Sequence, residues 1–151
     1  MSLQVDHAKA AELEREFDAE MRFRPLGISG TWIVTALLLA LSTFHFYTAG
    51  FGLLREQTHR GVHMALVLGL IFLVFAASRR SDAASPVIGW WRPGGVPLYD
   101  WGLFVAAVVS SLYLPSIFHE IAFKTGNPDP IDVVMGTTLT LVVLEATRRT
   151  M

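Results

Sequence analysis

The sequence predicts an all-α integral membrane protein in which four transmembrane helices form a bundle, preceded by an amphipathic N-terminal helix. Of the 151 residues, 52% are hydrophobic and 17% are charged, against roughly 25% charged in soluble domains. Charged residues are missing from three long stretches, namely 25–54, 61–78 and 101–119. Each stretch can supply the roughly 20 apolar residues that cross a hydrocarbon core.

The first 24 residues are expected to form a cytoplasmic amphipathic arm, followed by a transmembrane domain over residues 25–151. Between Ala8 and Arg24, apolar residues recur at helical spacing and share one face, while acidic residues lie largely elsewhere. Such a helix can bind a partner, lie on the membrane surface or remain a solvated tail. Its acidic character favours a protein partner over anionic lipid. The candidate contact residues are Leu13, Phe17 and Met21.

The spans are predicted at about 31–47, 61–78, 101–118 and 131–147. Aromatic residues at both ends of the first span are typical of the membrane interface. Pro115 is expected to kink or end the third span. The fourth has a clear start signal, because Asp129 can cap a helix whose first position is Pro130. Asp132 then places a negative charge in the first turn, which the helix dipole favours.

Two features of the spans predict contacts. In the third span, small residues four apart form a stripe where another helix can approach closely: Gly102, Ala106 and Ser110. Near the end of the fourth span, Glu145 is expected to form a local ion pair with Arg148 or Arg149, which lie three and four residues further on.

Basic residues predict the orientation. Nine Lys and Arg residues flank one side of the spans and three flank the other. The richer side belongs in the cytoplasm, so both chain ends are expected there. A net charge of −1 gives no case for binding nucleic acid.

Histidines gather at the predicted outer ends of the spans. The polar residues there are His45, His59, His63, His119 and Glu120. Imidazoles from facing helices can ligate haem or a metal ion. The alternative is interfacial histidines that hydrogen-bond loop carbonyls or water, and a lone His-x-x-x-His spacing does not distinguish the two. The interfacial interpretation is favoured because these histidines lie shallow in the predicted bundle, so no metal or cofactor site is assigned.

The sequence favours a protein that is not an enzyme. It has no cysteine, which excludes thiolate catalysis and cysteine-ligated metal. It also shows no paired nucleophile and base, no phosphate-binding glycine loop and no carboxylate pair at mid-membrane depth.

Five segments, in order, resemble one family, the fused permeases of tripartite ATP-independent periplasmic (TRAP) transporters of the TAXI type. The resemblance covers about residues 23–149. Its segments are Phe44-His45-Phe46-Tyr47-Thr48-Ala49-Gly50-Phe51-Gly52, Arg60-Gly61-Val62-His63-Met64-Ala65, Pro97-Leu98-Tyr99-Asp100-Trp101, Gly126-Asn127-Pro128-Asp129-Pro130-Ile131-Asp132 and Leu144-Glu145-Ala146-Thr147-Arg148-Arg149. They match the end of the first span, the starts of the next three, and the close of the small-subunit region.

The resemblance implies the small membrane component of a transporter for organic acids, in a bacterial or archaeal cytoplasmic (inner) membrane. Its expected partners are a large permease subunit or domain, a periplasmic solute-binding protein and the lipid bilayer. The coupling ion, Na⁺ or H⁺, is expected on the large subunit. Fused permeases continue for several hundred residues, so the chain is expected to be a separate small subunit or a fragment of a longer one. The alternative function is a small haem-binding electron-transfer membrane protein that uses the outer histidines.

Cysteine labelling tests the orientation in this cysteine-free chain. An impermeant thiol reagent applied to intact cells should label Gln57→Cys and leave Ser85→Cys unlabelled, because the two positions lie on opposite sides of the predicted membrane. The reverse pattern would show that the chain ends lie outside.

Overall fold

A computed structural model gives the fold, and it describes residues 23–52, 54–77, 92–121, 123–124 and 126–151. Four helices in this part of the chain are long and apolar enough to cross a membrane: α2 (Ile28–Gly50), α3 (Glu56–Val74), α5 (Leu98–Ser116) and α7 (Pro130–Thr150). A short 3-10 turn, η2 (Pro93–Gly95), precedes α5, and the short helix α6 (Phe118–Ile121) follows it. The prediction of an all-helical chain with four candidate spans is confirmed.

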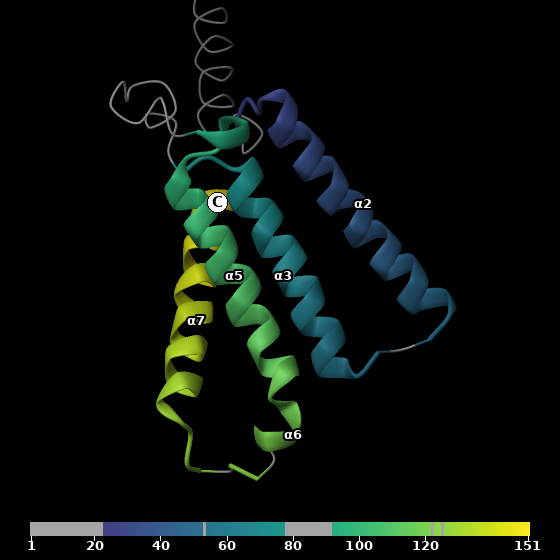
Figure 1. The fold of residues 1–151 in the computed structure, drawn as a ribbon, viewed down its shortest axis with the longest axis vertical. Helices are drawn as coiled ribbons and strands as arrows, with labels where there is room; N and C mark the ends of the chain where they lie inside the picture. Colours follow the sequence, from purple (N-terminus) through teal and green to yellow (C-terminus); the bar gives the residue numbers. More distant parts are fainter. Residues whose placement is uncertain (1–22, 53, 78–91, 122, 125) are drawn as a thin grey trace, which may run out of the picture.

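The helices form a packed group of three with α2 beside it (Figure 1). The buried apolar core joins α3, α5 and α7 through Leu68, Phe72, Ala107, Val142 and Ala146. Helix α2 contributes none of these residues and diverges from α3 toward the loop that connects the two (Figure 1). Only Gly30 and Thr48 of α2 are buried. The tight core is therefore a three-helix unit, which is narrower than the predicted four-helix bundle.

The closest helix approach lies between α3 and α5. In α3, Gly61, Ala65 and Gly69 lie four residues apart and are all buried. A Cβ atom on Gly61 would lie 2.8 Å from the Ser111 carbonyl oxygen, and one on Gly69 would lie 2.8 Å from the Phe104 ring. Lipid provides little hydrophobic drive for helices to associate, so small residues that allow close packing matter more here than in water.

The stripe predicted on α5 is packed only in part within this chain. Ser110 is buried and Ala106 is half-buried, but Gly102 is exposed, and a Cβ there would meet no atom within 4 Å. Within this chain, the small residues that lie four apart and allow close helix packing are Gly61, Ala65 and Gly69 of α3.

The helix ends follow local sequence chemistry. Asp129 and Asp132 form a reciprocal capping box at the start of α7, with the Asp129 amide donating to Asp132 Oδ2 at 2.8 Å. Pro130 occupies the first turn, as predicted. Pro115 lies one residue before the end of α5, and a break at Ile117 separates α5 from α6.

The start of α2 is held against η2. The Gly27 amide donates to the Gly94 carbonyl at 3.1 Å, and Gly94 has a φ of +70°. A side chain on Gly30 would overlap that same carbonyl. Glycine readily adopts the positive φ angle found at Gly94, and glycine at position 30 leaves room for the Gly94 carbonyl group. The start of α2 and η2 can therefore touch directly.

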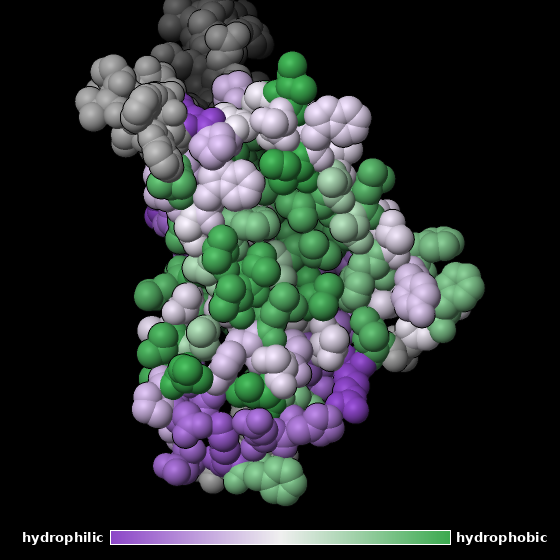
Figure 2. Space-filling model, in the orientation of Figure 1, coloured by the Kyte–Doolittle hydropathy of each residue, from purple (hydrophilic) through white to green (hydrophobic). Residues whose placement is uncertain are grey.

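The surface has the distribution that a bilayer requires. Hydrophobic residues cover the middle of the face shown in Figure 2, and hydrophilic residues gather beneath them near α6. Large apolar side chains on the outer sides of the helices are widely exposed, for example Trp32 and Val134. With the four candidate spans, this distribution indicates a multi-pass membrane protein.

Matched glycine substitutions test the packing of α3 on α5. Gly61→Ala should lower stability by about 1–3 kcal/mol, because the added methyl group overpacks the contact with Ser111. Gly102→Ala adds the same methyl group in open space and should cause no loss. Thermal unfolding in detergent measures both. Equal melting temperatures for the two variants would contradict this packing.

Candidate functional site

Buried charges meet where the segment before α2 reaches the start of α5 and the end of α7, at the end of the molecule that we call the Asp100 end (top of Figure 1). Asp100 lies in the first turn of α5, Arg24 just precedes α2, and Arg149 lies in the last turn of α7. Arg149 Nη1 is 2.7 Å from Asp100 Oδ1, and Arg24 forms an ion pair with Asp100 Oδ2. The side chains of all three are at most 1% exposed.

Further groups neutralise and orient Arg149. Its Nε atom donates to Glu145 Oε1 at 2.8 Å, and Nη1 donates to the Phe75 carbonyl at 3.3 Å. Its guanidinium lies 5.0 Å from the centre of the Phe72 ring, within the range of a cation–π contact. Glu145 also accepts from Arg148 at 2.7 Å, so the local ion pairs predicted for Glu145 are confirmed.

The cluster links helices that are remote in sequence. Asp100 lies at the positive end of the α5 dipole, and Arg149 lies at the negative end of the α7 dipole. A buried charge without a partner is costly, so each of these residues requires the others in place. The contacts of the cluster join the segment before α2, the start of α5 and the end of α7, so we call it the charge clasp.

Sequence reasoning did not find this clasp. The predicted third span begins just after Asp100, and the only contact predicted for Arg149 is the local pairing with Glu145. The sequence did contain one sign of this cluster. Asp100 is an acidic residue at the edge of a long apolar run, and a charge at the edge of a span requires a partner. The partners lie 76 and 49 residues away, and helical spacing reveals pairs only within a few residues.

The predicted outer polar residues lie at the opposite end, which we call the histidine end, in two groups. His45 of α2 and His63 of α3 share a hydrogen bond of 2.9 Å between Nε2 and Nδ1. The centre of the His59 ring lies 5.6 Å from the centre of the His45 ring and 5.0 Å from the centre of the Phe44 ring. These side chains bridge α2 and α3 where the helices diverge. Among the described residues, no group of three or more histidine, cysteine or acidic side chains is arranged to hold a metal ion.

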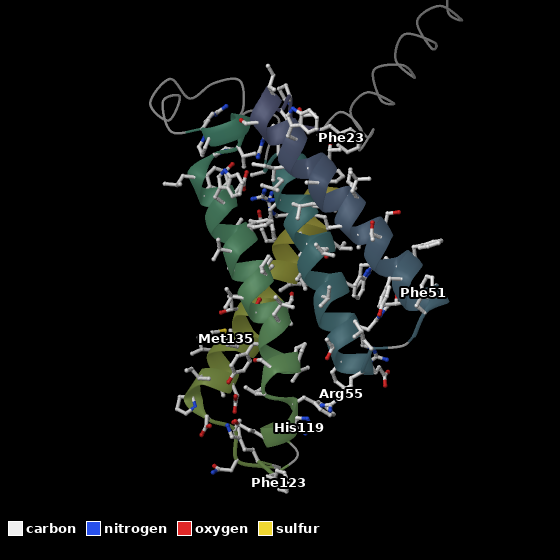
Figure 3. The ribbon with its side chains drawn as sticks, turned by 45° about the vertical axis from the view of Figure 1, so that its right-hand side comes forward. Phe23, Phe51, Arg55, His119, Phe123 and Met135 are labelled. Carbon is white, nitrogen blue, oxygen red and sulfur yellow. The ribbon has the colours of Figure 1, made fainter. Side chains whose placement is uncertain are left out.

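His119 and Glu120 belong to a separate group. Arg55, at the start of α3, lies next to His119 of α6 and contacts its Nε2 atom (Figure 3). The Glu120 carboxylate is 3.6 Å from Lys124 Nζ. The five residues therefore form two separate groups, which spacing along the sequence does not show. The haem-binding alternative stays a prediction.

Lys124 joins the α6–α7 connection to the start of α7. Its Nζ atom donates to Asp129 Oδ2 at 2.6 Å, and this bond raises the pKa of Lys124 above its ordinary value. Tyr113 of α5 donates a hydrogen bond to Asp132 of α7. These contacts tie α5 to the capping box of α7, so the histidine end of the three-helix unit is also closed by polar groups.

The predicted partner-contact residues Leu13, Phe17 and Met21 lie outside the described residues. The amphipathic arm stays a prediction. Comparisons of the chain with protein-family models, curated proteins and solved structures found no match.

Removing the central charge of the clasp should destabilise the protein. Asp100→Asn removes the carboxylate that Arg24 and Arg149 share, although Arg149 keeps its contact with Glu145. Breaking a buried ion pair typically costs about 3–5 kcal/mol. The melting temperature in detergent should fall sharply.

A matched control isolates the effect of burial. Glu56→Gln makes the same chemical change in an ion pair with Arg60 whose side chains are 64% and 75% exposed, where solvent screens the interaction. It should change the melting temperature little. If Asp100→Asn were as mild as Glu56→Gln, the cluster would not be what holds this end together.

Proposed function

We propose that the chain is the small membrane scaffold component of a TRAP-type secondary transporter, which takes up organic acids with a periplasmic binding protein. The observation that carries the proposal is the ordered set of segments that resemble TAXI-type fused permeases. In the fold, four of these segments lie at helix termini: the end of α2, the starts of α5 and α7, and the end of α7. The segment 60–65 lies inside α3, four residues after its start. Residues that specify helix ends define a bundle's topology, so this placement supports a shared architecture.

The distribution of charge supports a static role. Residues 25–54, 61–78, 101–118 and 133–144 contain no Asp, Glu, Lys or Arg. A transported organic acid and its coupling ion need polar groups or broken helices near the membrane midplane. The polar clusters of this chain instead lie at the two ends of the spans, where they join helices to one another. Substrate and coupling ion are therefore assigned to a large permease partner, and no catalytic role is assigned to the chain.

Helix α2 offers a surface for that partner. Its half-buried residues follow one face: Val34, Leu37, Leu41, Phe44 and His45. The remaining sides expose apolar residues such as Leu38, Leu39 and Phe46. A helix that meets its own chain along one narrow face leaves most of its surface for lipid or another subunit. We place the protein in the cytoplasmic membrane with both ends inside, following its basic residues.

Reconstitution tests the proposal. Liposomes containing the chain alone should take up no more dicarboxylate than empty liposomes. Adding a large permease subunit and a binding protein, identified from the same gene cluster, should give saturable uptake. Saturable uptake by the chain alone, or failure of the permease to co-purify with it, would contradict the scaffold role.

The amphipathic arm provides a second test of assembly. Phe17→Asp should reduce co-purification of the permease, because it places a charge on the apolar face expected to contact the partner. Glu12→Gln changes the opposite, polar side of the expected helix and serves as the control. Equal co-purification with both variants would remove the arm from the interface.

A further inference from the structure

One hydrogen bond joins α2 to α3, and two histidines form it. The Nε2 atom of His45 lies 2.9 Å from the Nδ1 atom of His63. No other hydrogen bond links these two helices within the residues that the structure describes. Helix α2 contributes no residue to the apolar core and diverges from α3 toward this end (Figure 1). The attachment of α2 at the histidine end therefore depends on the state of these two imidazoles.

The histidine pair has no carboxylate beside it to balance a positive charge. A third imidazole, His59, lies with its ring centre 5.6 Å from that of His45. Residues 25–54 and 101–119, which include all of α2 and most of α5, contain no Asp, Glu, Lys or Arg. The other charged or titratable side chains near this end contact groups outside the pair: Glu56 contacts Arg60, Glu120 and Asp129 contact Lys124, His119 contacts Arg55, Asp132 contacts Tyr113, and Tyr47 stacks on Phe51.

Protonation changes what two imidazoles can do for each other. In a neutral pair, one ring donates its N–H group and the other accepts, and one added proton still leaves one acceptor. When both rings are protonated, every ring nitrogen is a donor, so the hydrogen bond is lost. Two positive charges then repel each other across ring centres that lie 4.9 Å apart. All three histidines are only half-buried, so protons can reach them.

We propose that His45 and His63 form a proton-sensitive latch, which holds α2 against α3 while at most one of the two rings is protonated and loosens when both are. A proton on His59 places a further positive charge beside the pair and favours the loosened state. The inference stands apart from the proposed transport function, because the latch and both helices belong to this chain.

The direction of the pH dependence follows from proton counting. The loosened state can bind one more proton than the latched state, so acid favours loosening. Imidazole in water takes up a proton near pH 6.5. The latched state should therefore predominate above about pH 6.5 and lose ground as the pH falls below it.

Solid-state nitrogen-15 NMR tests the bond itself. The full chain is placed in liposomes with its histidine rings labelled, and signals are assigned with His45→Gln and His63→Gln. At about pH 8, coupling across the hydrogen bond should connect His45 Nε2 to His63 Nδ1, and at about pH 5 the coupling should be gone and both rings should show imidazolium shifts. Absence of the coupling at the higher pH, or its persistence at the lower one, would overturn the proposal.

Spin labels test whether proton uptake moves α2. Labels on exposed positions 43 of α2 and 137 of α7 report the separation of α2 from the three-helix unit. A chelator keeps metal ions from bridging the histidines. As the pH falls below about 6.5, the ratio of loosened to latched molecules should rise by up to about tenfold per pH unit, the limit for one extra proton. A distance distribution that does not change with pH would contradict the latch.

Matched substitutions assign the response to the pair. His45→Gln keeps a side chain that can hydrogen-bond to His63 but takes up no proton, so most of the pH response of the label distance should be lost. His119→Gln removes a histidine at the same end that contacts Arg55, and it should keep the full response. A normal response in His45→Gln, or loss of the response in His119→Gln, would show that the pair is not the sensor.

Discussion

The ion pairs of Asp100 with Arg24 and Arg149 are the constraint on which the rest of the fold depends. A carboxylate and guanidinium groups buried at the edge of a membrane protein are stable only when they meet. Their meeting fixes the start of α5, the end of α7 and the segment before α2 at one place. The Phe75 carbonyl accepts from Arg149, so the residue after α3 joins the same point.

From this fixed end, packing is tight along three helices and weak along the fourth. Gly61, Ala65 and Gly69 allow α3 to lie directly on α5, and Val142 and Ala146 complete the core from α7. Helix α2 has no such row. Its start contacts η2 at Gly27 and Gly30, and the helix then diverges from α3. Toward the histidine end, the hydrogen bond between His45 and His63 connects α2 to α3. This arrangement gives a firm unit with one helix available for contacts outside the chain.

Local features of the sequence predicted local structure well. The four spans followed from runs without charge, and the start of α7 followed from Asp129, Pro130 and Asp132, because a capping box involves only neighbouring residues. Sequence patterns did not show which face of α5 packs within the chain, or which residue pairs with Asp100. Gly102 had the right spacing for close packing but looks away from the core, since spacing fixes which residues share a face and not what that face meets. The pairing of Asp100 with Arg149 depends on how helices are placed in space, which no short pattern records.

The central claim is that the charge clasp fixes the Asp100 end while α2 is held more loosely at the histidine end. Electron–electron double resonance between spin labels measures this directly, because the chain has no native cysteine. Labels on exposed positions 31 and 147 report the Asp100 end, and labels on exposed positions 49 and 137 report the histidine end. In the isolated chain, the first pair should give a narrow distance distribution and the second a broad one, and Asp100→Asn should broaden the first. A distribution at the Asp100 end that is as broad as that at the histidine end, or is unaffected by Asp100→Asn, would contradict the account.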